Sequence, residues 1–175
     1  MARPDFCQLA LPHMGALYRT AVRMGGGPAE AEDLVQETYL EGFRCYGSLR
    51  DPERCRPWLF RILHNLWSER RARERARTGL GADDEASRNL EREIVDTGYS
   101  EEMEAALKDL PEDFRTALLL VTVEEMSYAE VAEVMGCPIG TVRSRVARGR
   151  ALLATALATA RAEQAPAAEP RKESL

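Results

Sequence analysis

Hydroxyl and guanidinium groups gather on one face of a predicted helix near the C-terminal end of the chain. Thr141, Ser144 and Arg148 share that face at an advance of about 100° per residue, and Arg145 lies beside them. No acidic residue occurs within residues 141–161. Because guanidinium and hydroxyl groups donate hydrogen bonds to base edges and phosphates, the pattern predicts a helix that binds DNA in the major groove.

A helix-turn-helix over Ser127–Leu153 would position these side chains. Ser127 and Glu130 have the spacing of a capping box at the start of the first helix. Gly136 suits the exit from that helix, and Pro138 suits the first turn of the next one. The second helix carries an apolar stripe that should be buried: Val142, Val146, Leu153 and Leu157. A helical hairpin with solvated arginines is the alternative for this segment taken alone.

A second cationic helix is predicted upstream, and it combines arginine with tryptophan. Trp67 falls among Leu63 and Leu66, which predicts that this tryptophan belongs to the core. Trp58 stands at the helix start, and its role stays open between core packing and contact with DNA. Aromatic rings stack on unpaired bases while cations hold phosphates, so the helix is a candidate site for single-stranded DNA. The interleaved polar residues are Arg61, His64, Asn65, Arg70, Arg71 and Arg73.

An earlier predicted helix has an outer face that mixes carboxylates, an amide and apolar groups. Its inward side is expected to carry Ala31, Leu34, Val35 and Thr38. The opposite side then presents Asp33, Gln36, Glu37 and Leu40, with Phe43 near its edge. Such a face suits docking to a basic protein helix. An ordinary amphipathic helix with an acidic solvent side is the alternative when the segment is considered alone.

Charge is distributed unevenly along the 175 residues, whose formal net charge is -5. Residues 50–77 hold nine arginines and four acids, and residues 141–161 hold five arginines and no acid. Residues 78–113, between them, hold twelve acids and three cations. Two basic segments that flank an acidic one indicate two separate contacts with nucleic acid, which the net charge conceals.

Other classes of function find no support in the residue pattern. The scattered cysteines and two histidines form no metal-binding or disulfide pattern, so neither a metal nor a cofactor is expected. An enzyme is not expected, because no nucleophile with a base and no phosphate-binding loop can be assembled. The absence of a long apolar run and of a secretory signal pattern favours a cytoplasmic protein without direct membrane insertion.

The helical signals predict an all-α fold of two small helical domains joined by a flexible acidic linker. Helices are expected over residues 9–24, 29–46, 58–77, 101–110 and 112–125, ahead of the helix-turn-helix, with a loop at 47–57. The first domain is expected at 1–77, the linker at 78–98, the second domain at 99–161, and a disordered tail at 162–175.

Three motifs occur in the order AEDLVQETYLEGF, RPWLFRILHNLWSERRARER and LPEDFRTALLLVTVEEMSYAEVAEVMGCPIGTVRSRVARGR. In order and spacing they resemble the extracytoplasmic function (ECF) family of bacterial RNA polymerase sigma factors, in the sigma-70 superfamily. The two predicted domains look like the sigma region 2 helical bundle and the sigma region 4 helix-turn-helix of that family. The resemblance implies an alternative sigma factor that binds core RNA polymerase, recognises promoter elements, helps melt DNA and directs initiation.

The resemblance also assigns roles by position. Asp33, Gln36 and Glu37 match the face that docks on the clamp helices of the polymerase's largest subunit, and Leu40 shares that face. The loop at 47–56 matches the one that receives a flipped base of the -10 element. Contacts to the -10 element are expected from Trp58, Arg61, Asn65, Arg70, Arg71 and Arg73. Contacts to the -35 element are expected from Arg143, Ser144, Arg145 and Arg148, which match the family's reading helix, and from Thr141, which periodicity places on the same face.

The partners implied by the resemblance are core RNA polymerase, promoter DNA and an anti-sigma factor. The polymerase contacts would include the flap of the second-largest subunit as well as the clamp helices. An anti-sigma factor could also hold the protein at the membrane. Two other classes stay open: a helix-turn-helix regulator that acts on duplex DNA without polymerase, and a sigma-mimicking protein that titrates an anti-sigma factor.

Overall fold

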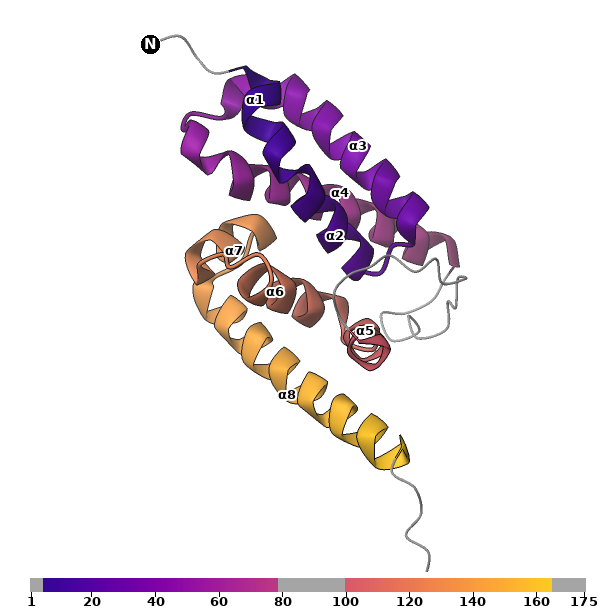
Figure 1. Ribbon diagram of the computed structural model, residues 1–175. Helices are drawn as coiled ribbons and strands as arrows, with labels where there is room; N and C mark the ends of the chain where they lie inside the picture. Colours follow the sequence, from indigo (N-terminus) through magenta and orange to yellow (C-terminus); the bar gives the residue numbers. More distant parts are fainter. Residues whose placement is uncertain (1–4, 79–99, 165–175) are drawn as a thin grey trace, which may run out of the picture.

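The computed structural model describes residues 5–78 and 100–164, and every regular element in these ranges is helical (Figure 1). The expected all-α fold is therefore confirmed. The N-terminal unit, residues 5–78, contains α1 (Phe6–Ala10), η1 (Leu11–His13), α2 (Met14–Arg23), α3 (Pro28–Cys45), η2 (Tyr46–Ser48), η3 (Pro52–Arg54) and α4 (Cys55–Thr78). The C-terminal unit, residues 100–164, contains α5 (Glu101–Lys108), α6 (Glu112–Thr122), α7 (Tyr128–Met135) and α8 (Ile139–Gln164).

The first predicted helix is divided in the structure. We expected one helix over residues 9–24, but α1 ends at Ala10 and α2 begins at Met14, with the 3-10 turn η1 between them. Pro12 explains the division, because it has no N–H group to donate to the carbonyl four residues earlier and its ring crowds that carbonyl. Gly25 follows α2 with a φ of 117°, a backbone conformation that glycine adopts without strain.

The predicted loop at 47–57 is shorter and more ordered than expected. It contains the turns η2 and η3, and the Asp51 carboxylate caps η3 by accepting a hydrogen bond from the Glu53 N–H at 3.0 Å. α4 already begins at Cys55. The expected loop end was wrong because Pro57 lies in the first turn of α4, where proline is favourable and does not break a helix.

The helix-turn-helix forms as predicted. The Ser127 hydroxyl accepts a hydrogen bond from the Glu130 N–H at 3.2 Å, and the Glu130 carboxylate accepts one from the Ser127 N–H at 2.9 Å. Gly136 ends α7 in the left-handed conformation, with a φ of 60°. Val142 and Val146 are buried, and the later residues of the apolar stripe are partly covered. The capped first helix and the buried valines together set the direction of α8.

The ends of the described ranges bear on the predicted boundaries. α8 continues to Gln164, so its last turn enters the segment that we expected to be tail from residue 162. Residues 79–98 of the predicted linker and 165–175 of the predicted tail lie outside the described residues. Within the described ranges, no helix combines the length and apolar character needed to cross a membrane.

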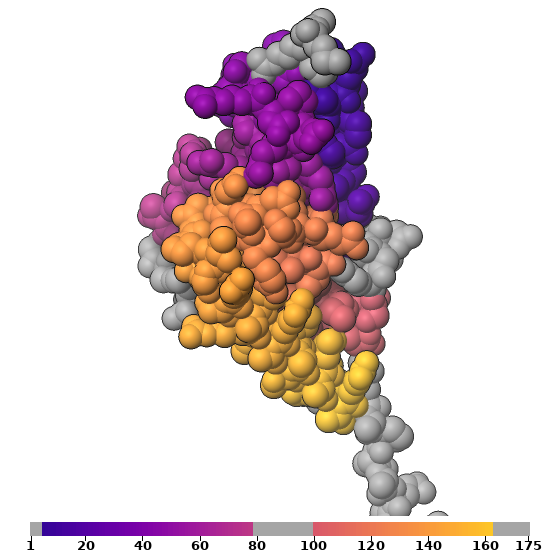
Figure 2. All heavy atoms as spheres, turned by 90° about the vertical axis from the view of Figure 1, so that its left-hand side faces the viewer, coloured from indigo at the N-terminus to yellow at the C-terminus, as the bar shows by residue number. Residues whose placement is uncertain are grey.

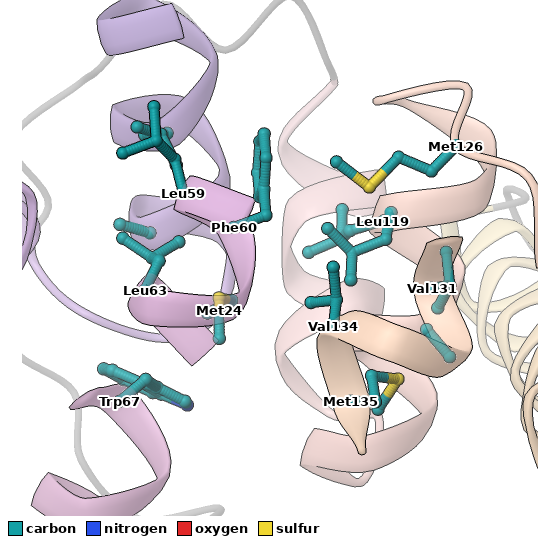
Figure 3. Packing of buried hydrophobic residues seen from close by; sticks show 14 of the residues in the cluster. Met24, Leu59, Phe60, Leu63, Trp67, Leu119, Met126, Val131, Val134 and Met135 are labelled. Atoms are coloured by element: carbon teal, nitrogen blue, oxygen red, sulfur yellow. The ribbon is translucent and has the colours of Figure 1, made fainter. Parts of the chain in front are cut away.

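One hydrophobic core extends across both units. α4 packs against α7, and α2 contacts both α5 and α6. Phe60 lies on the side of α4 that faces Leu119 and Val134 (Figure 3). In the space-filling view, the atoms of α7 lie directly against those of the N-terminal unit (Figure 2). We call this packing of the two units the closed arrangement.

Candidate nucleic-acid and protein interfaces

The predicted DNA-reading face of α8 is largely accessible. Arg143, Ser144 and Arg148 are exposed, and Thr141 is half-buried. The Ser144 hydroxyl donates a hydrogen bond to the Thr141 carbonyl at 2.9 Å, and the Arg143 guanidinium stands 5.9 Å from the centre of the Tyr128 ring in α7. The helix therefore presents two cationic groups and one hydroxyl, and it follows the capped helix α7.

Arg145 differs from its neighbours on α8. Its guanidinium pairs with the Asp113 carboxylate of α6 and donates a hydrogen bond to the Cys137 sulfur at 3.5 Å. Its side chain is only 22% exposed. Within the C-terminal unit Arg145 connects α8 to α6, a role that helical periodicity cannot reveal because Asp113 is distant in sequence.

The predicted -10 residues of α4 fall into two groups. Arg61, Asn65 and Arg73 are exposed, and Trp58 is half-buried at the start of the same helix. Arg73 also pairs with Glu69 one turn earlier, with Nη2 3.2 Å from Oε2. Trp67 is buried at 1% exposure, as expected for a core residue. The exposed group carries the charge and hydrogen-bonding capacity that a DNA strand needs.

Arg70 and Arg71 are engaged within the protein. Arg70 Nη2 lies 2.9 Å from Glu37 Oε2 of α3. Arg71 Nη1 lies 2.7 Å from Glu74 Oε2, and its guanidinium stands 5.4 Å from the centre of the Trp67 ring. The structure therefore couples one predicted DNA residue to the predicted docking face of α3.

That face of α3 is exposed as the sequence predicted. Asp33, Gln36, Glu37 and Leu40 all point away from the core, and Leu40 is 58% exposed. Phe43 extends the same side at 66% exposure and stacks edge-to-face on Phe6, with ring centres 5.7 Å apart. Two large apolar side chains bordered by carboxylates have the composition of a protein-binding surface.

A charged contact between the units has Glu124 at its centre. Its carboxylate is 4% exposed, accepts a hydrogen bond from the Thr20 hydroxyl at 3.0 Å and lies 2.7 Å from Arg56 Nη2. Arg54 Nη2 lies 2.5 Å from Glu133 Oε2 of α7 at the rim. We did not predict these contacts, because sequence patterns carry no signal for pairs that join distant segments.

Two histidines lie near the same boundary, and the pKa of each is lowered. Burial lowers the pKa of His64 in α4, the nearby Asp113 carboxylate opposes this shift, and the Arg145 guanidinium adds to it. Burial also lowers the pKa of His13, with a smaller contribution from Arg56. Protonation of either imidazole is therefore disfavoured in the closed arrangement.

A capped helix-turn-helix joined to a second helical unit with a cationic helix defines the class: a DNA-binding transcription protein. Comparison with known proteins then gives the family. The family model described as Sigma-70 region 2 matches residues 9–77, and the model described as Sigma-70, region 4 matches residues 100–153.

Relatives match over most of the chain. ECF RNA polymerase sigma factor SigE of Mycolicibacterium smegmatis is 36% identical over 174 residues, which cover 95% of this chain and 67% of that protein. ECF RNA polymerase sigma factor EcfG of Rhodopseudomonas palustris is 37% identical over 150 residues, or 85% of this chain and 81% of that protein.

A solved structure is similar as well. The sigma factor RpoE, crystallised with the anti-sigma factor NepR from Bartonella quintana, has a TM-score of 0.72 and 29% identity, covering 88% of this chain and 97% of its own. The chain belongs to the ECF family of sigma-70 RNA polymerase sigma factors. It is an alternative sigma factor, which directs transcription initiation.

Proposed function

We propose that this sigma factor recruits core RNA polymerase to promoters through three surfaces. The α3 face with Asp33, Gln36, Glu37 and Leu40 binds the clamp helices of the largest subunit. The α4 face holds the opened strand of the -10 element, and the α8 face reads the -35 element. The C-terminal unit also contacts the flap of the second-largest subunit. The exposure of Arg143, Ser144 and Arg148 on the capped helix-turn-helix is the observation that carries this proposal.

The mechanism divides recognition between two helices. α8 binds duplex DNA, while α4 captures a base that only the melted strand offers, so recognition is coupled to opening. One bidentate base contact supplies on the order of 1 to 3 kcal/mol of discrimination, so each helix alone gives modest specificity. Attachment to one polymerase makes the two contacts act together. The protein thus contributes binding energy and needs no catalytic group of its own.

The Arg70–Glu37 ion pair supports coupling between polymerase and DNA binding. Glu37 belongs to the proposed docking face, and Arg70 belongs to the proposed -10 face. A basic clamp helix that takes the Glu37 carboxylate leaves the Arg70 guanidinium available for a phosphate. Docking on polymerase therefore prepares α4 for the promoter strand.

An anti-sigma factor is the proposed regulator. The similar RpoE structure was obtained with the anti-sigma factor NepR, and the similarity covers 88% of this chain, so it includes both units. The α3 and α8 faces are exposed in this structure, so a regulator that covers them keeps the chain from polymerase and DNA. The protein acts in the bacterial cytoplasm, where transcription occurs, and is held at the membrane if its anti-sigma factor is anchored there.

Transcription in vitro with core polymerase on a promoter library tests this function. We expect a defined subset of promoters to be transcribed only when both proteins are present. Specific duplex binding without polymerase would identify a conventional regulator. Binding to an anti-sigma factor without any transcription would identify a sigma-mimicking protein.

A charge-reversed docking face gives a matched variant for that assay. Asp33→Lys with Glu37→Lys should abolish retention of core polymerase on the immobilised protein, because a basic clamp helix then meets like charge. Helical content measured by circular dichroism should stay unchanged, since both side chains are exposed. Retention equal to that of the wild-type chain would refute the docking assignment.

A further inference from the structure

At one part of the boundary, arginines of the N-terminal unit face carboxylates of the C-terminal unit. The N-terminal unit contributes Arg54 and Arg56, and the C-terminal unit contributes Glu124 and Glu133. Arg56 also donates a hydrogen bond to the Glu124 carbonyl at 2.6 Å, so one guanidinium holds both the backbone and the side chain of that residue. Around the start of α4, a cationic surface of one unit is therefore covered by carboxylates of the other.

Other ion pairs also join the units, from Arg71 and Arg75 to Glu112 at 3.9 Å, and burial distinguishes the two pairs formed by Arg54 and Arg56. The side chains of Arg54 and Glu133 are 47% and 59% exposed, and exposed pairs contribute little to stability. The Glu124 side chain is 4% exposed. A buried carboxylate must be paired and hydrogen-bonded to offset its loss of hydration, and Arg56 and Thr20 provide those contacts. Of these two pairs, loss of the Arg56–Glu124 contact would therefore cost more, because it would leave a buried carboxylate without its cation.

The backbone after α6 places Glu124 at this position. α6 ends at Thr122, earlier than the expected 125, and the Glu124 N–H donates to the Leu119 carbonyl at 3.1 Å. Glu125 then adopts a φ of 51°, a left-handed conformation uncommon for residues other than glycine. This sharp exit directs Glu124 into the N-terminal unit while Glu125 stays exposed.

The same two arginines begin the cationic helix α4. Arg54 ends η3, Arg56 lies in the first turn of α4, and the exposed Arg61 and Asn65 follow along that helix. Guanidinium groups bind carboxylates and phosphates in the same planar geometry. A DNA strand that follows α4 toward its N-terminus therefore reaches the guanidinium groups that Glu124 and Glu133 occupy in the closed arrangement.

We propose that Arg54 and Arg56 form a phosphate-binding site for single-stranded DNA, and that Glu124 and Glu133 occupy it as intramolecular competitors of the strand. The choice of DNA as ligand rests on the proposed function. Because the two occupants exclude each other, closure weakens DNA binding, and DNA binding opens the closed arrangement to the same extent. The C-terminal unit thus inhibits the -10 surface by contacts within the chain.

Binding of a fluorescent oligothymidylate to the full chain, measured by anisotropy, tests the competition. Glu124→Gln keeps the shape of the side chain and removes its charge, so we expect about tenfold tighter binding, as for the loss of one charge-assisted competing contact. Glu125→Gln is the matched control, since it makes the same change of net charge one residue away. Equal affinities for these two variants would overturn the proposal.

Two further variants show whether the increase in oligonucleotide affinity depends on Arg54 and Arg56. Adding Arg56→Gln to Glu124→Gln should abolish the increase in oligonucleotide affinity. If the increase persisted in this double variant, the assignment of Arg56 as a phosphate ligand would be contradicted. Glu133→Gln, at an exposed position that folding tolerates, should strengthen binding about twofold relative to the control Glu101→Gln. No difference between this pair would exclude Arg54 from the site.

A measurement without DNA separates the closed arrangement from the identity of the ligand. Small-angle scattering should show a larger radius of gyration for Glu124→Gln than for Glu125→Gln. Expansion without tighter oligonucleotide binding would refute the phosphate site. If Glu124→Gln bound the oligonucleotide more tightly and expanded, but the wild-type chain supported no transcription with core polymerase, the result would support the competition. It would refute the proposed function instead.

Discussion

Arginine side chains in this protein are distinguished by the anion that each one faces. Arg143 and Arg148 are exposed on α8, whereas Arg70 and Arg145 pair with carboxylates of other helices. A guanidinium group stays charged throughout the physiological pH range, so its availability to DNA depends on exchange of partners and not on titration. The unequal charge distribution predicted two cationic segments but could not show which arginines are engaged within the chain.

Arg148 offers a direct test of an available arginine. Arg148→Ala should reduce transcription about tenfold from a promoter with an intact -35 element, as expected when a bidentate base contact of about 1 to 3 kcal/mol is lost. On a template whose -35 element has been scrambled, the variant and the wild-type chain should be equally weak. Multi-round transcription on the two templates measures both effects.

Arg161→Ala is the matched control for Arg148→Ala. Arg161 is exposed near the end of the same helix but lies beyond the proposed reading face. Its loss removes the same charge and should leave the preference for the intact -35 element unchanged. If the two variants lost activity equally on both templates, general attraction to DNA would explain the arginines and the assignment to the -35 element would fail.

At the scale of helices, the direction of α8 depends on local contacts that precede it. The Ser127–Glu130 capping box begins α7, and the left-handed Gly136 ends it. Val142 and Val146 then attach α8 to the core at 0% and 1% exposure. Each of these contacts joins residues close in sequence, or follows helical periodicity, so each could be predicted before the structure was known.

Removal of the cap should weaken the C-terminal unit without changing its surface charge. Ser127→Ala deletes the hydroxyl that accepts the Glu130 N–H, and the expected loss of unfolding free energy is about 1 kcal/mol. Urea denaturation followed by circular dichroism measures this loss. Ser144→Ala removes an exposed hydroxyl within α8 and should cost less, so equal losses would show that the capping box contributes nothing specific.

Contacts between distant segments mark where prediction from the sequence ended. The fold class, the helix-turn-helix and the outward face of α3 follow from periodicity and capping signals. The division at Pro12 and the early start of α4 show that a proline is interpreted correctly only when its place within a helix is known. The Arg56–Glu124 contact joins residues 68 apart in sequence, a separation over which helical periodicity carries no information.

At the scale of the whole molecule, the closed arrangement and activity make opposite demands. The core shared by α4, α6 and α7 stabilises the closed state, and Arg56, which we propose to hold DNA, contributes to the same boundary. A partner that binds one state preferentially shifts the balance by its difference in affinity for the two. Polymerase and promoter DNA favour the open state in this scheme, and an anti-sigma factor favours the closed one.

The half-buried His64 should make the stability of the closed protein depend on pH. In the unfolded chain this imidazole has its usual pKa of 6.5, whereas burial lowers the pKa in the folded protein. Below pH 6.5 the unfolded chain binds more protons at this imidazole than the folded protein does. The contribution of His64 to the unfolding free energy is therefore complete above pH 6.5 and is lost as the pH falls below it. The unfolding free energy from urea titrations should therefore be lower at about pH 5.5 than at about pH 7.5.

Substitution of the imidazole isolates its share of this pH dependence. His64→Gln should unfold with a shallower dependence over the same interval, because it no longer takes up a proton on unfolding. The pKa of His13 is lowered as well, so His13→Gln is needed as a parallel variant. The unfolding free energy of the variant that carries both changes should depend least on pH. Hydrogen bonds from Ser127 lower the pKa of the Glu130 carboxyl from its usual 4.5. Its contribution to the unfolding free energy is therefore lost at lower pH than the contribution of the histidines. If the double variant kept the full wild-type dependence on pH, neither imidazole would be the group that couples protonation to unfolding of the closed protein.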